Sequence, residues 1–150
     1  MSEKIILKGH KGIGGVTEGE AVVTRNALSY IFDVGGIWDT PMSARVTNRI
    51  NMPDIYGLDL ANKVLVFPTG RGGIFSTAML FGVTHKGIGP KAIVNVKTHP
   101  VFAYASVVLD IPTVDGFEKD PTIIVKTGDW IKVDAPNGII EVTRRDDGSK

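Results

Sequence analysis

The chain has 150 residues, of which 43% are hydrophobic, and this is enough for a single compact domain with its own core over residues 1–150. Its formal net charge is only +1 and its basic residues are scattered, which argues against a nucleic-acid partner or an anionic membrane surface. No apolar run approaches the roughly 18 residues of a membrane-spanning helix, and the first residues lack a signal-peptide pattern, so we expect a cytoplasmic protein.

The amino-terminal third reads as short strands followed by a long irregular segment. We predict strands at residues 5–7, 16–25 and 28–34, with a glycine-rich loop at 8–15 between the first two. Residues 35–59 show weak periodicity, and long ordered loops of this kind often serve a function or cover a partner. We therefore expect a protein–protein interface there. The apolar residues behind this expectation are Ile37, Trp38, Met42, Ile50, Met52 and Ile55.

The centre of the chain alternates strands and helices. Residues 63–67 form an apolar strand, and apolar residues at helical spacing predict a helix over 74–85. A strand at 91–96, a short buried helix at 101–109 and a short strand at 111–114 follow. The helical face that we expect to be buried consists of Ile74, Phe75, Ala78, Met79 and Phe81.

The final third returns to strands. We predict them at residues 122–125, 130–133 and 139–143, and the Asn-Gly pair at 137–138 is typical of a tight hairpin. The whole pattern has β-rich flanks around a β-α-β-α-β centre. It indicates a mixed α/β fold in one domain.

The turn between the strand at 63–67 and the helix at 74–85 is the strongest functional signal. A glycine-rich turn, Thr69-Gly70-Arg71-Gly72-Gly73, opens the helix and directs backbone N–H groups to one point, where the helix dipole adds about half a positive charge. Arg71 offers a planar, two-pronged donor to the same kind of group. The turn lacks the spacing of a nucleotide-binding motif. It therefore predicts a phosphate or carboxylate site, with an ordinary solvent-exposed turn as the alternative.

Cofactor ligands are scarce in this sequence. Cysteine is absent, which excludes disulfides, thiolate catalysis and thiolate-bound clusters within the chain. The three histidines do not have metal-ligand spacing, so the sequence predicts no metal site. They are His10, His85 and His99. We expect His99, which follows the strand at 91–96, at the same end of the sheet as Arg71; a plain surface position is the alternative.

Several short motifs occur in a fixed order along most of the chain. They are Gly14-Gly15 with Glu18-Gly19-Glu20-Ala21, residues 57–68 with Gly70-Arg71-Gly72, Gly89-Pro90-Lys91-Ala92-Ile93, Ile111-Pro112-Thr113-Val114-Asp115 and Gly128-Asp129-Trp130-Ile131-Lys132-Val133. In this order they resemble the small subunit of aconitase X-type hydro-lyases. The resemblance implies a swivelling β/β/α domain and a larger partner subunit that carries an iron–sulfur cluster on its own cysteines. Described members dehydrate mevalonate 5-phosphate or cis-3-hydroxyproline.

The resemblance breaks at the position of the family's proposed catalytic base. Members usually carry a serine after the Gly-Arg-Gly turn, whereas this chain has Gly73 followed by Ile74. Three explanations stay open. Ser76 or Thr77 takes over the hydroxyl role, the partner supplies the base, or the chain is a relative without dehydratase activity.

The resemblance and the residues together give a specific expectation. The chain would close over the partner's iron–sulfur site and bind a small anionic hydroxy acid or phosphorylated substrate. The expected substrate-binding residues are Thr69, Gly70, Arg71, Gly72, Gly73 and His99, and the expected catalytic residues are Ser76 and Thr77. We expect no metal ligand in this chain. A non-catalytic binding or scaffolding domain with the same fold is the alternative.

Overall fold

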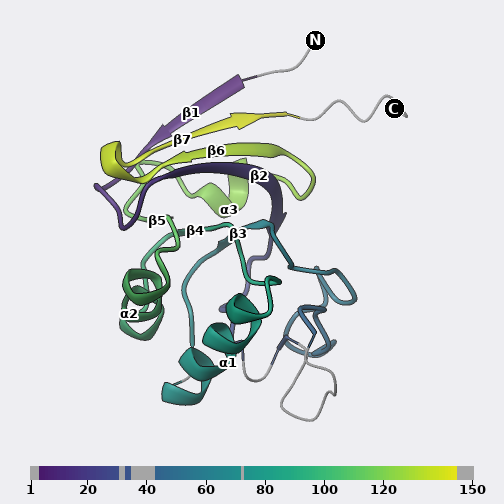
Figure 1. Ribbon diagram of the computed structural model, residues 1–150. Coiled ribbons are helices and arrows are strands. Elements are labelled where there is room, and N and C mark those ends of the chain that lie inside the picture. Colours follow the sequence, from purple (N-terminus) through teal and green to yellow (C-terminus); the bar gives the residue numbers. More distant parts are fainter. Residues whose placement is uncertain (1–3, 31–32, 35–42, 72, 145–150) are drawn as a thin grey trace.

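The computed structural model describes residues 4–30, 33–34, 43–71 and 73–144, and their strands form one seven-stranded sheet (Figure 1). The strand order is β1-β7-β6-β2-β3-β4-β5. The long strand β2 belongs to both halves of this sheet, because it pairs antiparallel with β6 and parallel with β3. The sheet therefore has an antiparallel half and a parallel half that meet at β2.

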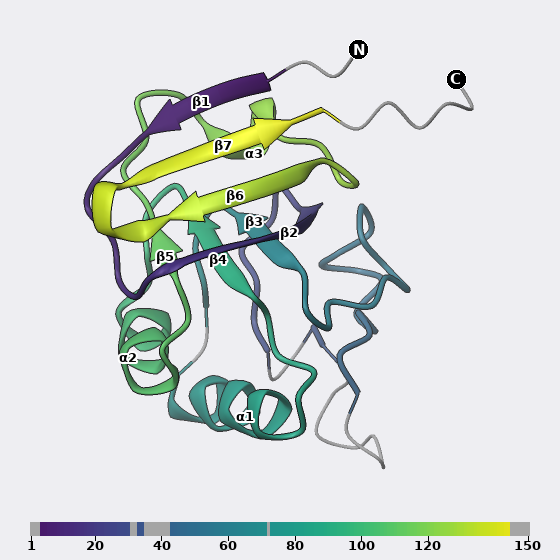
Figure 2. The same ribbon diagram turned by 45° about the horizontal axis from the view of Figure 1, so that its top comes forward.

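The antiparallel half is built from regular strands, and among its paired strands only β6 and β7 are consecutive along the chain. Its strands are β1 (Lys4–Lys8), β2 (Val16–Val23), β6 (Trp130–Asp134) and β7 (Ile139–Thr143). A short 3₁₀ turn, η1 (Ala135–Asn137), joins β6 to β7 and ends at Gly138, which has the left-handed φ of 68°. Figure 2 shows β1, β7 and β6 side by side as one layer. The Asn-Gly signal thus correctly predicted this hairpin.

The parallel half carries two helices on its outer face. Its further elements are β3 (Val64–Phe67), α1 (Ile74–His85), β4 (Ala92–Asn95), α2 (Pro100–Leu109) and β5 (Thr113–Val114). Strands β2, β3, β4 and β5 run parallel, and α1 and α2 lie beneath them in Figure 1. Four consecutive buried residues in both β3 and β4 fit strands that are covered on both faces.

Two hydrophobic clusters hold three layers together. One lies between the two halves of the sheet and includes Val66, Val94 and Ile131. The other lies between the parallel strands and the helices and includes Leu65 and Phe102. The observed order of layers is sheet, sheet, helices, which confirms the predicted mixed α/β fold with β-rich flanks around a β-α-β-α-β centre.

Two predicted strands are wrong. Residues 28–34 form no strand where they are described, because Leu28 pairs only as an isolated bridge with Gly70 and the chain then turns. Residues 122–125 fall instead mostly within a short helix, α3 (Pro121–Ile124). Asp120 caps it by accepting a hydrogen bond from the N–H of Thr122 at 2.9 Å. Proline after an N-cap aspartate favours a helix start over a strand.

The predicted helix at 74–85 has the bounds of α1, but its buried face differs from the prediction. Ala78 is exposed, whereas Leu80 and Val83 are buried with Met79. The polar residues Ser76 and Thr77 are also buried. The prediction is confirmed for Met79 and wrong for Ala78, because the buried stripe follows residues 76, 79, 80 and 83, which share one helical face. The side chains of Ile74 and Phe75 lie outside the described part of the structure.

The irregular segment contributes to the protein's own core. Met52 and Ile55 are buried in the helix-side cluster, so they are not free to form the interface that we expected of them. Ile50 is 89% exposed. The expectation for Ile37, Trp38 and Met42 concerns residues outside the described ranges. Among the described helices, none combines the length and apolarity needed to cross a membrane.

Candidate functional site

The carboxyl ends of β2, β3 and β4 lie at one edge of the parallel strands, and the predicted anion-binding loop leaves the middle strand. Ligands of open parallel sheets bind most often at this edge. The loop of residues 69–73 connects β3 to α1, whose N-cap is Gly73. Gly73 has no side chain to form a capping hydrogen bond at this helix start, so the N-cap residue itself does not compete with an anion.

Backbone pairing and close packing fix the loop on two sides. The N–H of Leu28 donates to the carbonyl of Thr69 (3.1 Å), and the N–H of Arg71 donates to the carbonyl of Leu28 (2.9 Å). Gly70 lies so close to the ring of Phe102 in α2 that a Cβ would overlap it. The loop thus needs glycine at this position to rest on the second helix.

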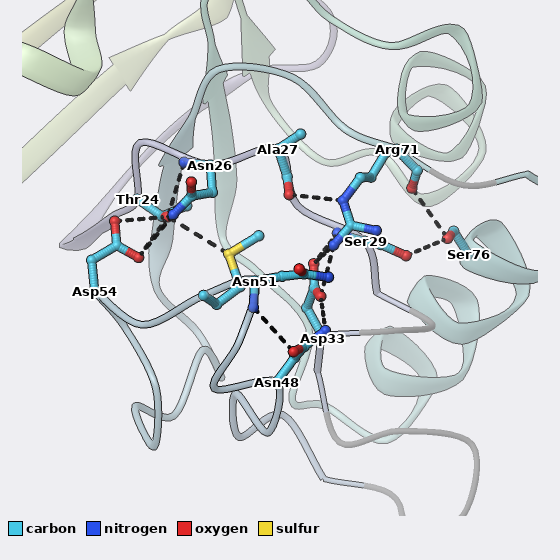
Figure 3. Close-up of polar contacts among 11 residues, drawn as sticks. Thr24, Asn26, Ala27, Ser29, Asp33, Asn48, Asn51, Asp54, Arg71 and Ser76 are labelled. Atoms are coloured by element: carbon cyan, nitrogen blue, oxygen red, sulfur yellow. Dashed lines mark hydrogen bonds and ion pairs between the residues drawn. The ribbon is translucent and has the colours of Figure 1, made fainter.

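Arg71 points across the loop toward the segment that follows β2 (Figure 3). Its Nη2 donates to both carboxylate oxygens of Asp33, at 2.8 and 2.7 Å, and its Nε donates to the carbonyl of Ala27 at 3.2 Å. The arginine side chain remains 35% exposed, whereas Asp33 is fully buried. The structure therefore holds the guanidinium through Nε and Nη2, while Nη1 makes no hydrogen bond with the described residues.

Asp33 is the centre of a buried polar network. Besides Arg71, its carboxylate accepts hydrogen bonds from the N–H of Ser29 (2.8 Å) and from Nδ2 of Asn48 (2.9 Å). A buried carboxylate is strongly unfavourable unless a cation and several donors surround it. Here donors from three separate segments converge on it. The sequence contained one signal of this: Asp33 is the sole acidic residue in the apolar stretch 28–34.

The two predicted catalytic hydroxyls have different surroundings. Ser76 is 1% exposed, and its Oγ lies 3.1 Å from Oγ of Ser29 and 3.4 Å from the carbonyl of Arg71. In this conformation the Ser76 hydroxyl is therefore engaged inside the protein. Thr77 instead lines an apolar pocket of about 370 Å³ between the first turns of α1 and α2. The other lining residues are Pro100, Val101 and Tyr104.

Of the remaining predicted residues, His99 and Gly73 can be placed. His99 follows β4 and is the N-cap of α2, where its Nδ1 accepts a hydrogen bond from the N–H of Val101 at 3.2 Å. It lies at the same sheet edge as the loop, but among the described residues it makes no hydrogen bond with Arg71, and its own hydrogen bond gives it a capping role. Gly73 has open space where a Cβ would be. Gly72 lies outside the described residues.

A second polar cluster, which sequence reasoning missed, braces the end of β2. The hydroxyl of Thr24 donates toward both carboxylate oxygens of Asp54, each at 2.9 Å (Figure 3). The N–H of Arg25 donates to the same carboxylate at 3.0 Å. Thr24 is buried and Asp54 is exposed. This cluster ties the irregular segment to the sheet edge through contacts 28 to 30 residues apart in sequence, and no short-range motif marks such contacts.

Tyr30 is a buried group near the site that the sequence did not single out. Its ring packs against Phe102 with centroids 6.4 Å apart, and its hydroxyl has no hydrogen-bond partner in the described part of the chain. Burial raises the pKa of the Tyr30 phenol well above its usual value, and the negative charge of Asp59 raises it further. Tyr30 therefore stays neutral and has a packing role at neutral pH.

The described residues contain no group of three or more His, Cys, Asp or Glu that could hold a metal ion. The whole sequence also contains no cysteine. Because biological iron–sulfur clusters are held mainly by cysteine thiolates, these residues do not fit such a group. A cluster that takes part in a reaction with this chain must be held elsewhere.

Comparison with a family model decides the relationship. The aconitase X swivel domain matches residues 6–142, which includes every strand and helix described above except the ends of β1 and β7. The chain belongs to the aconitase X swivel-domain family. The resemblance first noted in short motifs therefore extends over nearly the whole chain.

Relatives of known name agree with this assignment. This swivel domain is 34% identical over 131 residues to the phosphomevalonate dehydratase small subunit of Methanococcoides burtonii, covering 87% of this chain and 90% of that one. It is 32% identical over 137 residues to the protein of that name from Methanocella arvoryzae, covering 91% and 98%. These relatives are subunits of a dehydratase, which is a hydro-lyase, and the words "small subunit" imply a larger partner for them.

A solved structure confirms the fold. The swivel domain superposes on the crystal structure of Thermococcus kodakaraensis aconitase X, in its holo-form, with a TM-score of 0.80 and 34% identity. The match covers 92% of this chain and 98% of the other. Since the chain matches nearly the full length of that protein, the expected swivelling-domain architecture is confirmed.

Proposed function

We propose that this chain is the small subunit of a two-chain hydro-lyase and that it binds an anionic hydroxy acid or a phosphorylated substrate at the 69–73 loop. The relatives named phosphomevalonate dehydratase small subunit support mevalonate 5-phosphate as the first substrate to test. The single observation that carries the proposal is Arg71, fixed at the start of α1 through Nε and Nη2, while Nη1 makes no hydrogen bond with the described residues.

The chemistry proposed for this chain is binding, orientation and exclusion of water. The backbone N–H groups of the loop and Nη1 of Arg71 would hold the phosphate or carboxylate, as helix starts and guanidinium groups do elsewhere. Closure over the partner's site would then align the substrate and remove bulk water. Elimination breaks a C–H and a C–O bond and forms a C=C bond, so a base must accept the proton from carbon.

Two hydroxyls near the start of α1 are candidates for the base. Thr77 lines an open pocket, whereas Ser76 must leave its contact with Ser29 before it can reach a substrate. We therefore propose Thr77 ahead of Ser76 as the hydroxyl of this chain, with a base on the partner as the alternative. An iron–sulfur cluster on the partner would supply the Lewis acid for the leaving hydroxyl.

Co-expression tests the proposal directly. The chain should be produced together with a cysteine-containing large subunit encoded beside it, and the complex isolated by size exclusion with light scattering. We expect a stable complex that dehydrates mevalonate 5-phosphate, while neither chain does so alone. A complex that forms but leaves mevalonate 5-phosphate and other anionic hydroxy acids unchanged would contradict the proposal.

One observation favours a second candidate, a non-catalytic member that keeps the swivel fold for assembly. Gly73 occupies the position of the family's serine, and the nearby hydroxyl of Ser76 is buried. The variant Gly73→Ser distinguishes the two functions, because the open space at Gly73 accepts the side chain. A complex that is inactive as it stands and gains dehydratase activity with Gly73→Ser would identify the second candidate.

A further inference from the structure

We propose that Asp33 is a positioning residue, which holds Arg71 so that Nη1 faces the substrate's anionic group. This inference rests on the proposed function, because it assigns the support of the same anion site. Asp33 itself touches no substrate: it is fully buried beneath the arginine. Its effect on binding would act through the guanidinium alone.

The hydrogen bonds of Arg71 account for the direction that it takes. A guanidinium has five N–H donors in a rigid plane. Nη2 uses its two donors on the two oxygens of Asp33, and Nε uses its one donor on the carbonyl of Ala27. These three bonds fix the plane and leave both donors of Nη1 together on one side. The two N–H bonds of Nη1 diverge, so Nη1 offers an anion separate charge-assisted hydrogen bonds and not the parallel pair that two neighbouring nitrogens supply.

Asp33 is held as firmly as the arginine that it holds. The N–H of Ser29 and Nδ2 of Asn48 donate to its two oxygens, and its own N–H donates to the carbonyl of Ser29 at 2.9 Å. The backbone of Arg71 is in turn paired with Leu28. The loop and the segment after β2 are therefore connected twice, once through the backbone and once through the ion pair.

Two opposing effects determine what the carboxylate does to anion binding. Its negative charge partly cancels the positive field of Arg71, which weakens attraction for an anion. Its geometry, however, orients the two Nη1 donors before the anion arrives, which strengthens binding. Four donor hydrogens converge on Asp33, so an amide in its place would meet donors with its own NH₂ group. We infer that loss of orientation outweighs the gain in charge.

The test compares variants in the purified two-chain complex. Asp33→Asn, Arg71→Ala and the double variant are assayed for the KM of mevalonate 5-phosphate and for inhibition by inorganic phosphate. Each single variant should raise the KM and the inhibition constant by about tenfold or more. The double variant should be no weaker than Arg71→Ala alone, because Asp33 acts only through that arginine.

Two further variants keep the test decisive. Asp54→Asn removes a carboxylate from the neighbouring cluster, which makes no contact with the loop, and should leave both constants unchanged. Asn48→Ala keeps both charges and removes one donor from Asp33, so it should raise both constants by a smaller factor even if Asp33→Asn does not fold. Size exclusion confirms that each variant still forms the complex.

The outcomes distinguish a failure of the role proposed for Asp33 from a failure of the anion site itself. If Arg71→Ala weakens binding while Asp33→Asn and Asn48→Ala do not, this inference is wrong and the anion site stands. If Asp33→Asn tightens phosphate inhibition, the carboxylate competes with the anion and the inference is also wrong. If Arg71→Ala itself changes neither constant, the proposed anion site is overturned, and the role of Asp33 with it.

Discussion

The two halves of the sheet obtain their shape in different ways. In the antiparallel half, β6 and β7 pair residue by residue across a short turn, from Trp130 with Thr143 to Asp134 with Ile139. At the carboxyl edge of the parallel half, irregular segments are held by carboxylates that contact residues far away in sequence, as Asp33 contacts Arg71. The β6–β7 hairpin depends on local pattern, whereas the carboxyl edge of the parallel half depends on particular side chains, and the candidate site lies at that edge.

The largest expected difference is between two ion pairs, one at the carboxyl edge of the parallel half and one on the exposed edge of the antiparallel half. Arg71→Ala leaves the buried carboxylate of Asp33 without its cation, so we expect a loss of about 2–3 kcal/mol in the free energy of unfolding. This loss is smaller than for a fully buried pair because Arg71 is partly exposed to water. Lys4→Ala removes an exposed pair with Glu141, at 3.5 Å, and should cost about 0.5 kcal/mol or less. Urea unfolding measures both, and equal losses would contradict the comparison.

Two glycines of the same loop provide the next test. Gly70→Ala places a methyl group into the ring of Phe102, which is itself packed against Phe67, so we expect a loss of about 1–3 kcal/mol. Gly73→Ala fills open space and should change stability by about 0.5 kcal/mol or less. Thermal unfolding of the two variants checks this. A tolerated alanine at position 70 would show that the loop does not rest on α2 as described.

A smaller effect is expected at the cap of α3, where the sequence pattern misled. Asp120→Ala removes the acceptor for the N–H and the hydroxyl of Thr122, at 2.9 and 2.6 Å. The free energy of unfolding should fall by about 1 kcal/mol, which is typical of a lost N-cap. Asp120→Asn retains an acceptor and is the matched control. Similar losses for both variants would argue against a capping role.

The smallest effect concerns Tyr30 and alkaline pH. Burial and Asp59 raise the pKa of the folded Tyr30 phenol above its unfolded value of about 10, so the folded state keeps its proton while the unfolded state loses it. Stability should therefore fall as the pH rises, by about 0.8 kcal/mol between pH 9 and 10.5 from this group. Tyr30→Phe should lose that part of the pH dependence in urea unfolding. Identical pH profiles for the two proteins would refute the assignment.

The sequence correctly predicted those elements of the fold that depend on residues close together along the chain. The helix at 74–85 has the bounds of α1 because its apolar spacing and flanking glycines act over a few residues, and the Asn-Gly pair fixed the β6–β7 turn for the same reason. Residues 28–34 were wrongly predicted as a strand because they are apolar, yet Leu28 pairs with the loop and Asp33 turns the chain.

The candidate site could be predicted only in part. A glycine turn that opens a helix is a local signal, so the loop and Arg71 were found from the sequence. The partners that hold Arg71 are Asp33 and Ala27, which lie 38 and 44 residues away from it along the chain. Nothing in the sequence links such distant residues, since the link is made by the fold. The same limit applies to Thr24 and Asp54.

A crystal structure of the two-chain complex with mevalonate 5-phosphate would test the central claim most directly. The account predicts the substrate's anionic group within about 3 Å of Nη1 of Arg71 and of the loop N–H groups, with Asp33 still bound to Nη2. An anionic group bound entirely by the large subunit, with Arg71 facing away from it, would contradict the account.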